Sequence, residues 1–155
     1  SSDVCSSDLQ RLLISSGHAT RVSALPAAIA ASLVHPNQTV VAFTGDGGLG
    51  MVVSELETVA RLGLPVVVVV FNDSLLSLIA VKQDEDSQGG RAVVEYQRCD
   101  FAEVARGFGV ESFVANNAED LRQALTVAVA SKRPALIDVT VDPTSYSAVF
   151  AALRE

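Results

Sequence analysis

A chain of 155 residues, 49% of them hydrophobic, has enough length and enough apolar surface to bury the core of one domain. The formal net charge of -7 excludes the basic surface that binding to DNA or RNA phosphates requires, so we expect no nucleic-acid partner. The longest unbroken apolar runs, such as residues 66–71, are far shorter than the roughly 20 residues of a membrane-spanning helix, and we expect no membrane partner.

The start of the chain differs in composition from the rest. Residues 1–9 have neither the basic nor the apolar region of a signal peptide, and they resemble translated adapter sequence. A native serine-rich linker is the alternative. We therefore expect a non-native or linker lead over residues 1–9, followed by a domain over residues 10–155 that is a fragment of a larger protein.

The chain has two cysteines, Cys5 and Cys99. Two cysteines are too few for a disulfide framework, and these two lack the CxxC spacing of metal ligands. The sequence therefore predicts a reducing, cytoplasmic setting.

From residue 25 onward, short apolar runs alternate with longer segments of helical period. Pro26 suits the first turn of a helix, Gly63 the C-terminal cap of another, and Asn117 the N-terminal cap of a third. We expect, in chain order, a helix over 25–33, a strand over 39–43, a glycine loop over 45–50, a helix over 51–62, a strand over 66–71, a helix over 101–108, a strand over 110–114, a helix over 117–131 and a strand over 135–141.

This order of elements determines the predicted fold. The β-branched run over 66–71 is typical of a central strand that is covered on both faces. Strands that alternate with helices are joined by right-handed crossovers and form a parallel sheet. The predicted fold class is α/β, a doubly wound, mostly parallel sheet flanked by helices. In such sheets, ligands bind beyond the carboxyl ends of the strands.

Two of the predicted strand ends carry acidic side chains. The strand over 39–43 leads into a Gly-Asp-Gly-Gly run with Asp46 as its acid, and the strand over 66–71 leads into Asn72 and Asp73. An isolated Asp-Gly or Asn-Asp pair is an ordinary turn. Both pairs, however, lie where a doubly wound sheet binds ligands, and the glycine loop opens a helix whose N–H groups can receive an anion.

The glycine loop also fits a second interpretation, because its glycines have the G-x-G-x-x-G spacing of dinucleotide-binding domains. Asp46 argues against that interpretation, since an unscreened contact between a carboxylate and a phosphate at about 4 Å costs about 4 kcal/mol at an effective dielectric of about 20. No Lys or Arg lies within residues 45–57 to offset this repulsion. A divalent metal held by Asp46 and Asp73 would offset it, and Mg²⁺ suits such oxygen ligands.

The segment GDGGLGMVVSELETVARLGLPVVVVVFND resembles the cofactor motif of thiamine-diphosphate-dependent enzymes, which begins with GDG and ends with NN or ND. The similarity is to the acetolactate synthase, pyruvate oxidase and benzoylformate decarboxylase group, and it covers nearly everything after the lead. It implies a C-terminal thiamine-diphosphate-binding domain in which Mg²⁺ is held by Asp46, Asp73 and the carbonyl of Leu75. Asp73 stands where Asn is commoner in the family. The cofactor contacts that the resemblance implies here are Gly45, Asp46, Gly47, Gly48, Asn72, Asp73 and Leu75.

Upstream, the segment LISSGHATRVSALPAAIAASL resembles the part of the family that lies beside the pyrimidine ring of the cofactor. The resemblance implies cofactor contacts from the backbone of Thr20 and Arg21, although Met is usual at the position of Arg21. Met51 matches a position that packs near the thiazolium ring in some relatives, and a core methionine is the alternative. His18 lies near this segment, but a histidine without a partner is not expected to be catalytic.

Other positions bear on the substrate and on catalysis. Acetolactate synthases usually have Gly near Ser77 and Trp near Lys82, so this chain departs from them in the helix expected after Asp73. The apolar positions of that helix suit either a pocket for a small 2-oxo acid or an ordinary core face. Glu55 and Glu57 follow the glycine loop, and we expect both at the surface.

The resemblance implies a cofactor with which a 2-oxo acid is decarboxylated or ligated to an acceptor carbonyl. It places the activating glutamate on a separate pyrimidine-binding domain, contributed across a homodimer or homotetramer interface. We therefore expect no catalytic residue in this chain and no activity from the fragment alone. Two alternatives stay open: an NAD-type dinucleotide-binding domain of an oxidoreductase, and a degenerate domain without catalysis.

Overall fold

The computed structural model of the protein describes residues 22–77, 79–80 and 94–146. Within them, four strands form one sheet in the order β1-β2-β4-β3, and all three strand pairs are parallel. The strands are β1 Val40–Gly45, β2 Val66–Asn72, β3 Glu111–Ala115 and β4 Ala135–Thr140. The predicted α/β class with a parallel sheet is confirmed.

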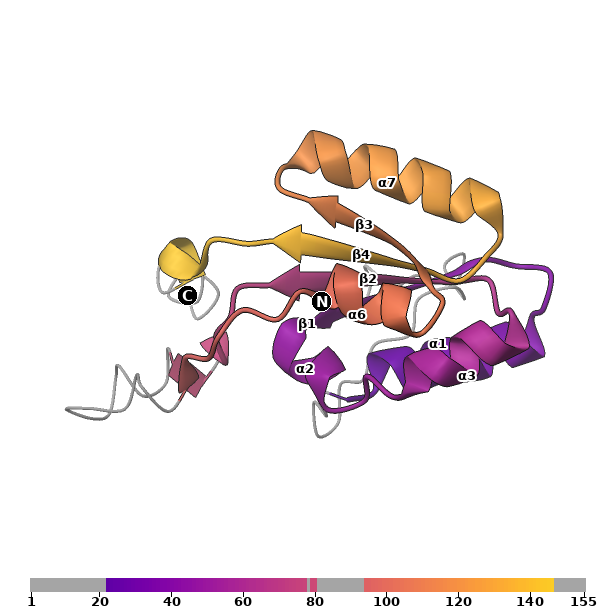
Figure 1. The fold of residues 1–155 in the computed structure, drawn as a ribbon, viewed down its shortest axis with the longest axis horizontal. Coiled ribbons are helices and arrows are strands. Elements are labelled where there is room, and N and C mark those ends of the chain that lie inside the picture. The colour runs from indigo at the N-terminus through magenta and orange to yellow at the C-terminus, as the bar shows by residue number, and fades with distance from the viewer. Residues whose placement is uncertain (1–21, 78, 81–93, 147–155) are drawn as a thin grey trace, which may run out of the picture.

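Helices cover both faces of this sheet (Figure 1). On one face lie α1 (Ala24–Val34), α3 (Glu55–Leu62) and α6 (Phe101–Gly107), which share a buried apolar cluster with the side chains of β2. On the other face, α7 (Ala118–Ser131) packs over β2, β4 and β3. The result is the three-layer arrangement expected when strands alternate with helices.

The strand β2 runs through the middle of the sheet, between β1 and β4. Its five valines, residues 66–70, are all buried, and they contribute alternately to the apolar clusters on the two faces. Coverage on both faces explains why this strand is one continuous apolar run. The next residue, Phe71, is 39% exposed and stacks on Phe43 of β1, which is 56% exposed, with the ring centroids 6.2 Å apart.

Gly63 ends α3 at the predicted position. Its φ of +61° lies in the left-handed region that glycine adopts without steric cost. The N–H of Gly63 donates to the carbonyl of Ala60, and the N–H of Leu64 donates to the carbonyl of Val59, both at 3.1 Å. These bonds satisfy carbonyls that the end of a helix leaves without intrahelical partners.

Polar side chains begin two other helices. The Asn117 side chain accepts hydrogen bonds from the N–H groups of Glu119 at 3.0 Å and Asp120 at 2.9 Å, which confirms the predicted cap of α7. At the start of α6, the Asp100 side chain accepts from the N–H of Glu103 at 2.8 Å. This second cap was not predicted.

The segment after β1 differs from the prediction. Residues Asp46–Gly50 form a short helix, α2, instead of a loop, and α3 begins at Glu55 instead of residue 51. Between the two helices, the N–H of Val52 donates to the carbonyl of Leu49 at 2.9 Å, and the N–H of Glu55 donates to Val52 at 3.0 Å. These tighter, three-residue turns occupy residues 51–54, so the helix predicted over 51–62 is shortened to α3, while α2 forms within the predicted glycine loop (Figure 1).

Both β1 and β2 extend beyond their last predicted residues. The parallel register pairs Gly45 with Phe71 and Asn72 with Thr140, so the ladder continues past the apolar runs. Asp46 and Asp73 each follow directly after the end of a strand. In the part of the chain that the structure describes, no helix combines the length and the apolar character needed to cross a membrane.

Candidate functional site

The carboxyl ends of β1 and β2 lie side by side, because the two strands are parallel neighbours. Asp46, directly after β1, is 4% exposed. One of its carboxylate oxygens, Oδ1, accepts a hydrogen bond from the N–H of Gly47 at 2.7 Å. The other, Oδ2, accepts from the N–H of Ser74 at 2.8 Å. The carboxylate of Asp46 therefore lies against the turn that carries Asp73.

The half-buried carboxylate of Asp73 is held within that same turn. Its Oδ1 accepts from the N–H of Leu75 at 2.9 Å, and its Oδ2 accepts from the hydroxyl of Ser77. The Ser77 hydroxyl oxygen also lies 3.3 Å from the carbonyl oxygen of Leu75. The two side chains and the one carbonyl predicted to hold a metal thus lie in one region at the edge of the sheet.

Residues 94–96 support this turn from a different part of the chain. The N–H of Tyr96 donates to the carbonyl of Ser74 at 3.1 Å, and the N–H of Leu76 donates to Val94 at 2.9 Å. Ser74 itself has a φ of +60°, an uncommon conformation for a residue with a side chain. The backbone of the turn is therefore fixed by bonds to Asp46 and to residues 94–96.

Tyr146 brings a third element to the site, because it follows directly after the 3-10 helix Pro143–Ser145 (η2), which comes after β4. Burial raises the pKa of the Tyr146 hydroxyl, and the negative charge of Asp73, a hydrogen bond with Asp73 and the charge of Asp46 raise it further. Both aspartates therefore lie close enough to act on one phenol. No local pattern in the sequence singled out Tyr146 or Ser77.

The charge of this site is unbalanced within the described residues. There, no ion pair joins either aspartate to Lys or Arg. The same residues contain no cluster of three or more His, Cys, Asp or Glu side chains that would hold a metal unaided. Two carboxylates and a nearby carbonyl are hard oxygen donors, and this set fits Mg²⁺ when oxygen atoms of a ligand complete its shell.

Asn72, the last residue of β2, belongs to a buried polar network. Its Nδ2 donates to the carbonyl of Cys99 at 2.9 Å and to the Asp138 carboxylate at 3.0 and 3.3 Å. Its Oδ1 is buried and has no hydrogen-bond partner among the described residues. A buried acceptor without a donor is uncommon in folded proteins, and it is expected where a ligand or an ordered water completes a site.

Asp138 is the buried carboxylate at the centre of this network. Besides Asn72, it accepts hydrogen bonds from the N–H of Phe101 at 3.0 Å and from Arg98 at 3.4 Å. Burial raises the pKa of the Cys99 thiol, and the charges of Asp138, Asp100 and Asp46 raise it further. Asp138 was not among the predicted site residues, although a single acid inside the apolar strand β4 indicates a buried polar partner.

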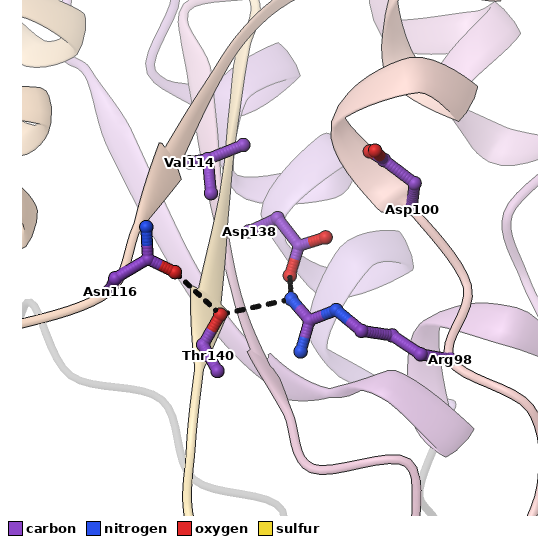
Figure 2. A pocket seen from close by; sticks show the side chains of 6 residues that line it. All are labelled: Arg98, Asp100, Val114, Asn116, Asp138 and Thr140. Carbon is purple, nitrogen blue, oxygen red and sulfur yellow. Dashed lines mark hydrogen bonds and ion pairs between the residues drawn. The ribbon is translucent and has the colours of Figure 1, made fainter.

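A pocket of about 320 Å³ lies beside this network, at the carboxyl ends of β3 and β4 (Figure 2). Figure 2 shows the Arg98 side chain reaching both Asp138 and Thr140. The Thr140 hydroxyl in turn donates to Oδ1 of Asn116 at 3.0 Å. Four of the polar side chains that line the pocket are thus linked in one chain of contacts, whereas the Asp100 carboxylate accepts from the N–H of Glu103. The lining residues are Arg98, Asp100, Val114, Asn116, Asp138 and Thr140.

The remaining predicted site residues have different surroundings. A Cβ atom on Gly47 would lie 2.7 Å from the end of the Leu76 side chain, so glycine permits a close approach there. Gly48 is buried and Gly45 is exposed. Met51 is 60% exposed, so the alternative of a core methionine is wrong.

The two glutamates after the glycine loop have different exposures. Glu57 is exposed as expected, whereas Glu55 is half-buried and accepts a hydrogen bond from Thr58 at 3.3 Å. The predictions for His18, Thr20 and Arg21 lie outside the described residues.

Comparison with known proteins shows the family to which the chain belongs. Residues 4–139 match the family model of the thiamine pyrophosphate enzyme, C-terminal TPP binding domain. The chain is 37% identical to the acetolactate synthase of Bacillus subtilis (strain 168) over 131 residues, which are 84% of this chain and 23% of that protein. It is 34% identical to the acetolactate synthase isozyme 1 large subunit of Escherichia coli (strain K12), over 84% of this chain and 23% of the relative.

A third relative, the pyruvate oxidase of Lactiplantibacillus plantarum (strain ATCC BAA-793 / NCIMB 8826 / WCFS1), is 33% identical over 84% of this chain and 22% of its own length. The chain thus spans less than a quarter of each of these three relatives. The cofactor that the family implies is thiamine diphosphate, normally with Mg²⁺. The chain belongs to the thiamine pyrophosphate enzymes, as a C-terminal TPP-binding domain.

Proposed function

We propose that this chain is the part of an acetolactate-synthase-like enzyme that binds thiamine diphosphate through Mg²⁺, and that the enzyme decarboxylates or ligates small 2-oxo acids. The observation that carries the proposal is the 2.8 Å hydrogen bond from the Ser74 N–H to the Asp46 carboxylate, because it joins the two acidic strand ends into one site. The names of the relatives, acetolactate synthase and pyruvate oxidase, support the substrate class. The family match favours this function over a dinucleotide-binding domain.

In this proposal, Asp46, Asp73 and the carbonyl of Leu75 would hold the metal, and the metal would supply the positive charge that a diphosphate needs beside two carboxylates. Each carboxylate in contact with a phosphate at about 4 Å would repel it by about 4 kcal/mol at an effective dielectric of about 20, if no cation screened the pair. A divalent cation changes this repulsion into attraction. When bound, thiamine diphosphate supplies the carbon nucleophile that makes a 2-oxo acid reactive.

The neighbouring residues have proposed roles in shaping the site. Gly45, Gly47 and Gly48 would let the backbone come close to the diphosphate, because glycine has no Cβ. The exposed side chain of Met51 is available to pack on the cofactor. Asn72 completes the cofactor contacts beside Asp73.

The proposal extends to parts beyond the described residues. The backbone of Thr20 and Arg21 would lie beside the pyrimidine ring. A pyrimidine-binding domain of the same enzyme would supply the activating glutamate across a homodimer or homotetramer interface. The chain alone would then be inactive. The larger enzyme that contains it would act in the cytoplasm.

The proposal is tested by calorimetric titration of the full polypeptide, that is, the full-length enzyme chain that contains these residues. Thiamine diphosphate is titrated with and without Mg²⁺. We expect binding only with the metal, and we expect Asp46→Asn to weaken it by about 100-fold or more, because the buried carboxylate contributes a ligand charge. Glu57→Gln, which removes an exposed carboxylate from α3, is the control and should bind as the parent does. Metal-independent binding of thiamine diphosphate, or binding of NAD in its place, would overturn the proposal.

A further inference from the structure

We infer that Ser77 is a positioning residue of the metal site, whose hydroxyl fixes the Asp73 carboxylate and the Leu75 carbonyl relative to each other. This inference rests on the proposed function, since it concerns the same metal. It adds a residue that lies outside the predicted ligand set.

The contacts of Ser77 single it out. Its hydroxyl donates to Oδ2 of Asp73, while Oδ1 of Asp73 accepts from the N–H of Leu75 at 2.9 Å. The same hydroxyl oxygen lies 3.3 Å from the carbonyl oxygen of Leu75. The Ser77 side chain therefore contacts both of the proposed metal-binding groups that follow β2, the Asp73 carboxylate and the Leu75 carbonyl.

These contacts restrict the orientation of the Asp73 carboxylate. The torsion that rotates a carboxylate about its Cβ–Cγ bond is broad and nearly two-fold, so an untethered aspartate samples many orientations. Hydrogen bonds to both carboxylate oxygens select one of these orientations. A metal then binds a carboxylate that is already oriented, so less of the binding free energy is spent on ordering that side chain. This is the usual effect of groups that hydrogen-bond metal ligands.

The backbone of the turn does not depend on the Ser77 side chain. The N–H of Ser74 donates to Asp46 at 2.8 Å, and the N–H of Leu76 donates to Val94 at 2.9 Å. Leu75 also forms an antiparallel bridge with Glu95. Removing the hydroxyl should therefore release the Asp73 side chain while leaving the turn in place.

The experiment measures metal binding directly. Mn²⁺ is titrated into the full polypeptide at saturating thiamine diphosphate, and free Mn²⁺ is followed by its electron paramagnetic resonance signal. We expect Ser77→Ala to weaken Mn²⁺ binding by about 10-fold or more, within the range seen when a group supporting a metal ligand is removed. Ser77→Thr, which keeps the hydroxyl, should recover most of the affinity. The control is Ser54→Ala, since Ser54 is exposed and its side chain makes no capping bond.

A double-mutant cycle identifies Asp73 as the group through which Ser77 acts. In an Asp73→Ala background, Ser77→Ala should change Mn²⁺ affinity by less than about two-fold, because the side chain that Ser77 orients is gone. If Ser77→Ala lowers the melting temperature, Ser77→Cys, a similar-sized and weaker donor, replaces it and should give a smaller loss of the same kind.

The outcomes separate this inference from the proposed function. If Ser77→Ala binds Mn²⁺ as the parent does while Asp46→Asn loses it, the positioning role is wrong and the metal site stands. An equal loss of Mn²⁺ affinity from Ser77→Ala with and without Asp73→Ala also overturns the role. If Asp46→Asn itself binds Mn²⁺ as the parent does, the proposed function fails.

Discussion

Single residues show how the sheet and the site are tied together, and Asp138 does so most directly. Its carboxylate is almost fully buried and receives hydrogen bonds from Asn72 at the end of β2, from the N–H of Phe101 at the start of α6, and from Arg98. Two segments far apart in the sequence, at residue 72 and residues 98–101, therefore share one acceptor. The side chain of Arg98 is 41% exposed, so water screens its charge.

We predict that Asp138→Ala lowers the free energy of unfolding by about 3 kcal/mol, because the buried donors of Asn72 and Phe101 lose their acceptor. Arg98→Met should cost less than about 1 kcal/mol, since the Arg98 side chain is partly in solvent. Urea denaturation of the two variants and the parent measures the difference. Equal losses would show that the exposed arginine, and not the buried acceptor, carries the stability.

At this scale the sequence predicted the acids but not their partners. Asp46 and Asp73 were predicted because each is an acidic residue directly after an apolar strand, which is where a doubly wound sheet binds ligands. Ser77 and Tyr146 were not found, since their contacts with Asp73 depend on the shape of the turn and on the path of the chain after β4. The contact of Tyr146 joins segments whose relative position no local pattern encodes, whereas that of Ser77 depends on the backbone of the turn, in which Ser74 has a φ of +60°.

At the scale of the elements, Gly63 determines where α3 stops and the chain turns toward β2. We predict that Gly63→Ala lowers the free energy of unfolding by about 1–2 kcal/mol, because an alanine in the left-handed region brings its Cβ close to the backbone. Gly50→Ala is the matched control. Gly50 is not among the positive-φ residues, and a Cβ there would meet nothing within 4 Å. Thermal unfolding measures both, and a larger loss for Gly50→Ala would contradict the prediction.

The elements themselves were largely predictable, and their boundaries less so. The valine run of β2 and the Asn117 cap of α7 are strong local signals, and both elements appear where expected. The start of α3 was predicted at residue 51 instead of Glu55, because the apolar positions of the helical face continue through residues 51–54, where the backbone forms three-residue turns. The spacing of apolar residues indicates a buried face, but it does not show where helical hydrogen bonding along that face begins.

The whole molecule should respond to its cofactor as one unit, because the site joins β1, β2 and the segment after β4. We predict that thiamine diphosphate with Mg²⁺, at about 100 times its dissociation constant, stabilises the full polypeptide by about 2.7 kcal/mol. Chelation of the metal with EDTA should reverse the effect. Thermal unfolding with each component alone and with both provides the measurement. Equal stabilisation by thiamine diphosphate with and without EDTA would contradict it.

The strand order β1-β2-β4-β3 also affects how the protein is made. β2 lies next to β4, and the Asn72 amide is bonded to an acid 66 residues further along the chain. During synthesis on the ribosome, the edge of the valine-rich strand β2 that pairs with β4 stays uncovered until β4 has been made. Pairings between such distant segments form slowly, and an apolar strand edge left open in the meantime favours aggregation. Truncated or stalled chains that end before β4 are therefore the species most exposed to misassembly and to capture by chaperones.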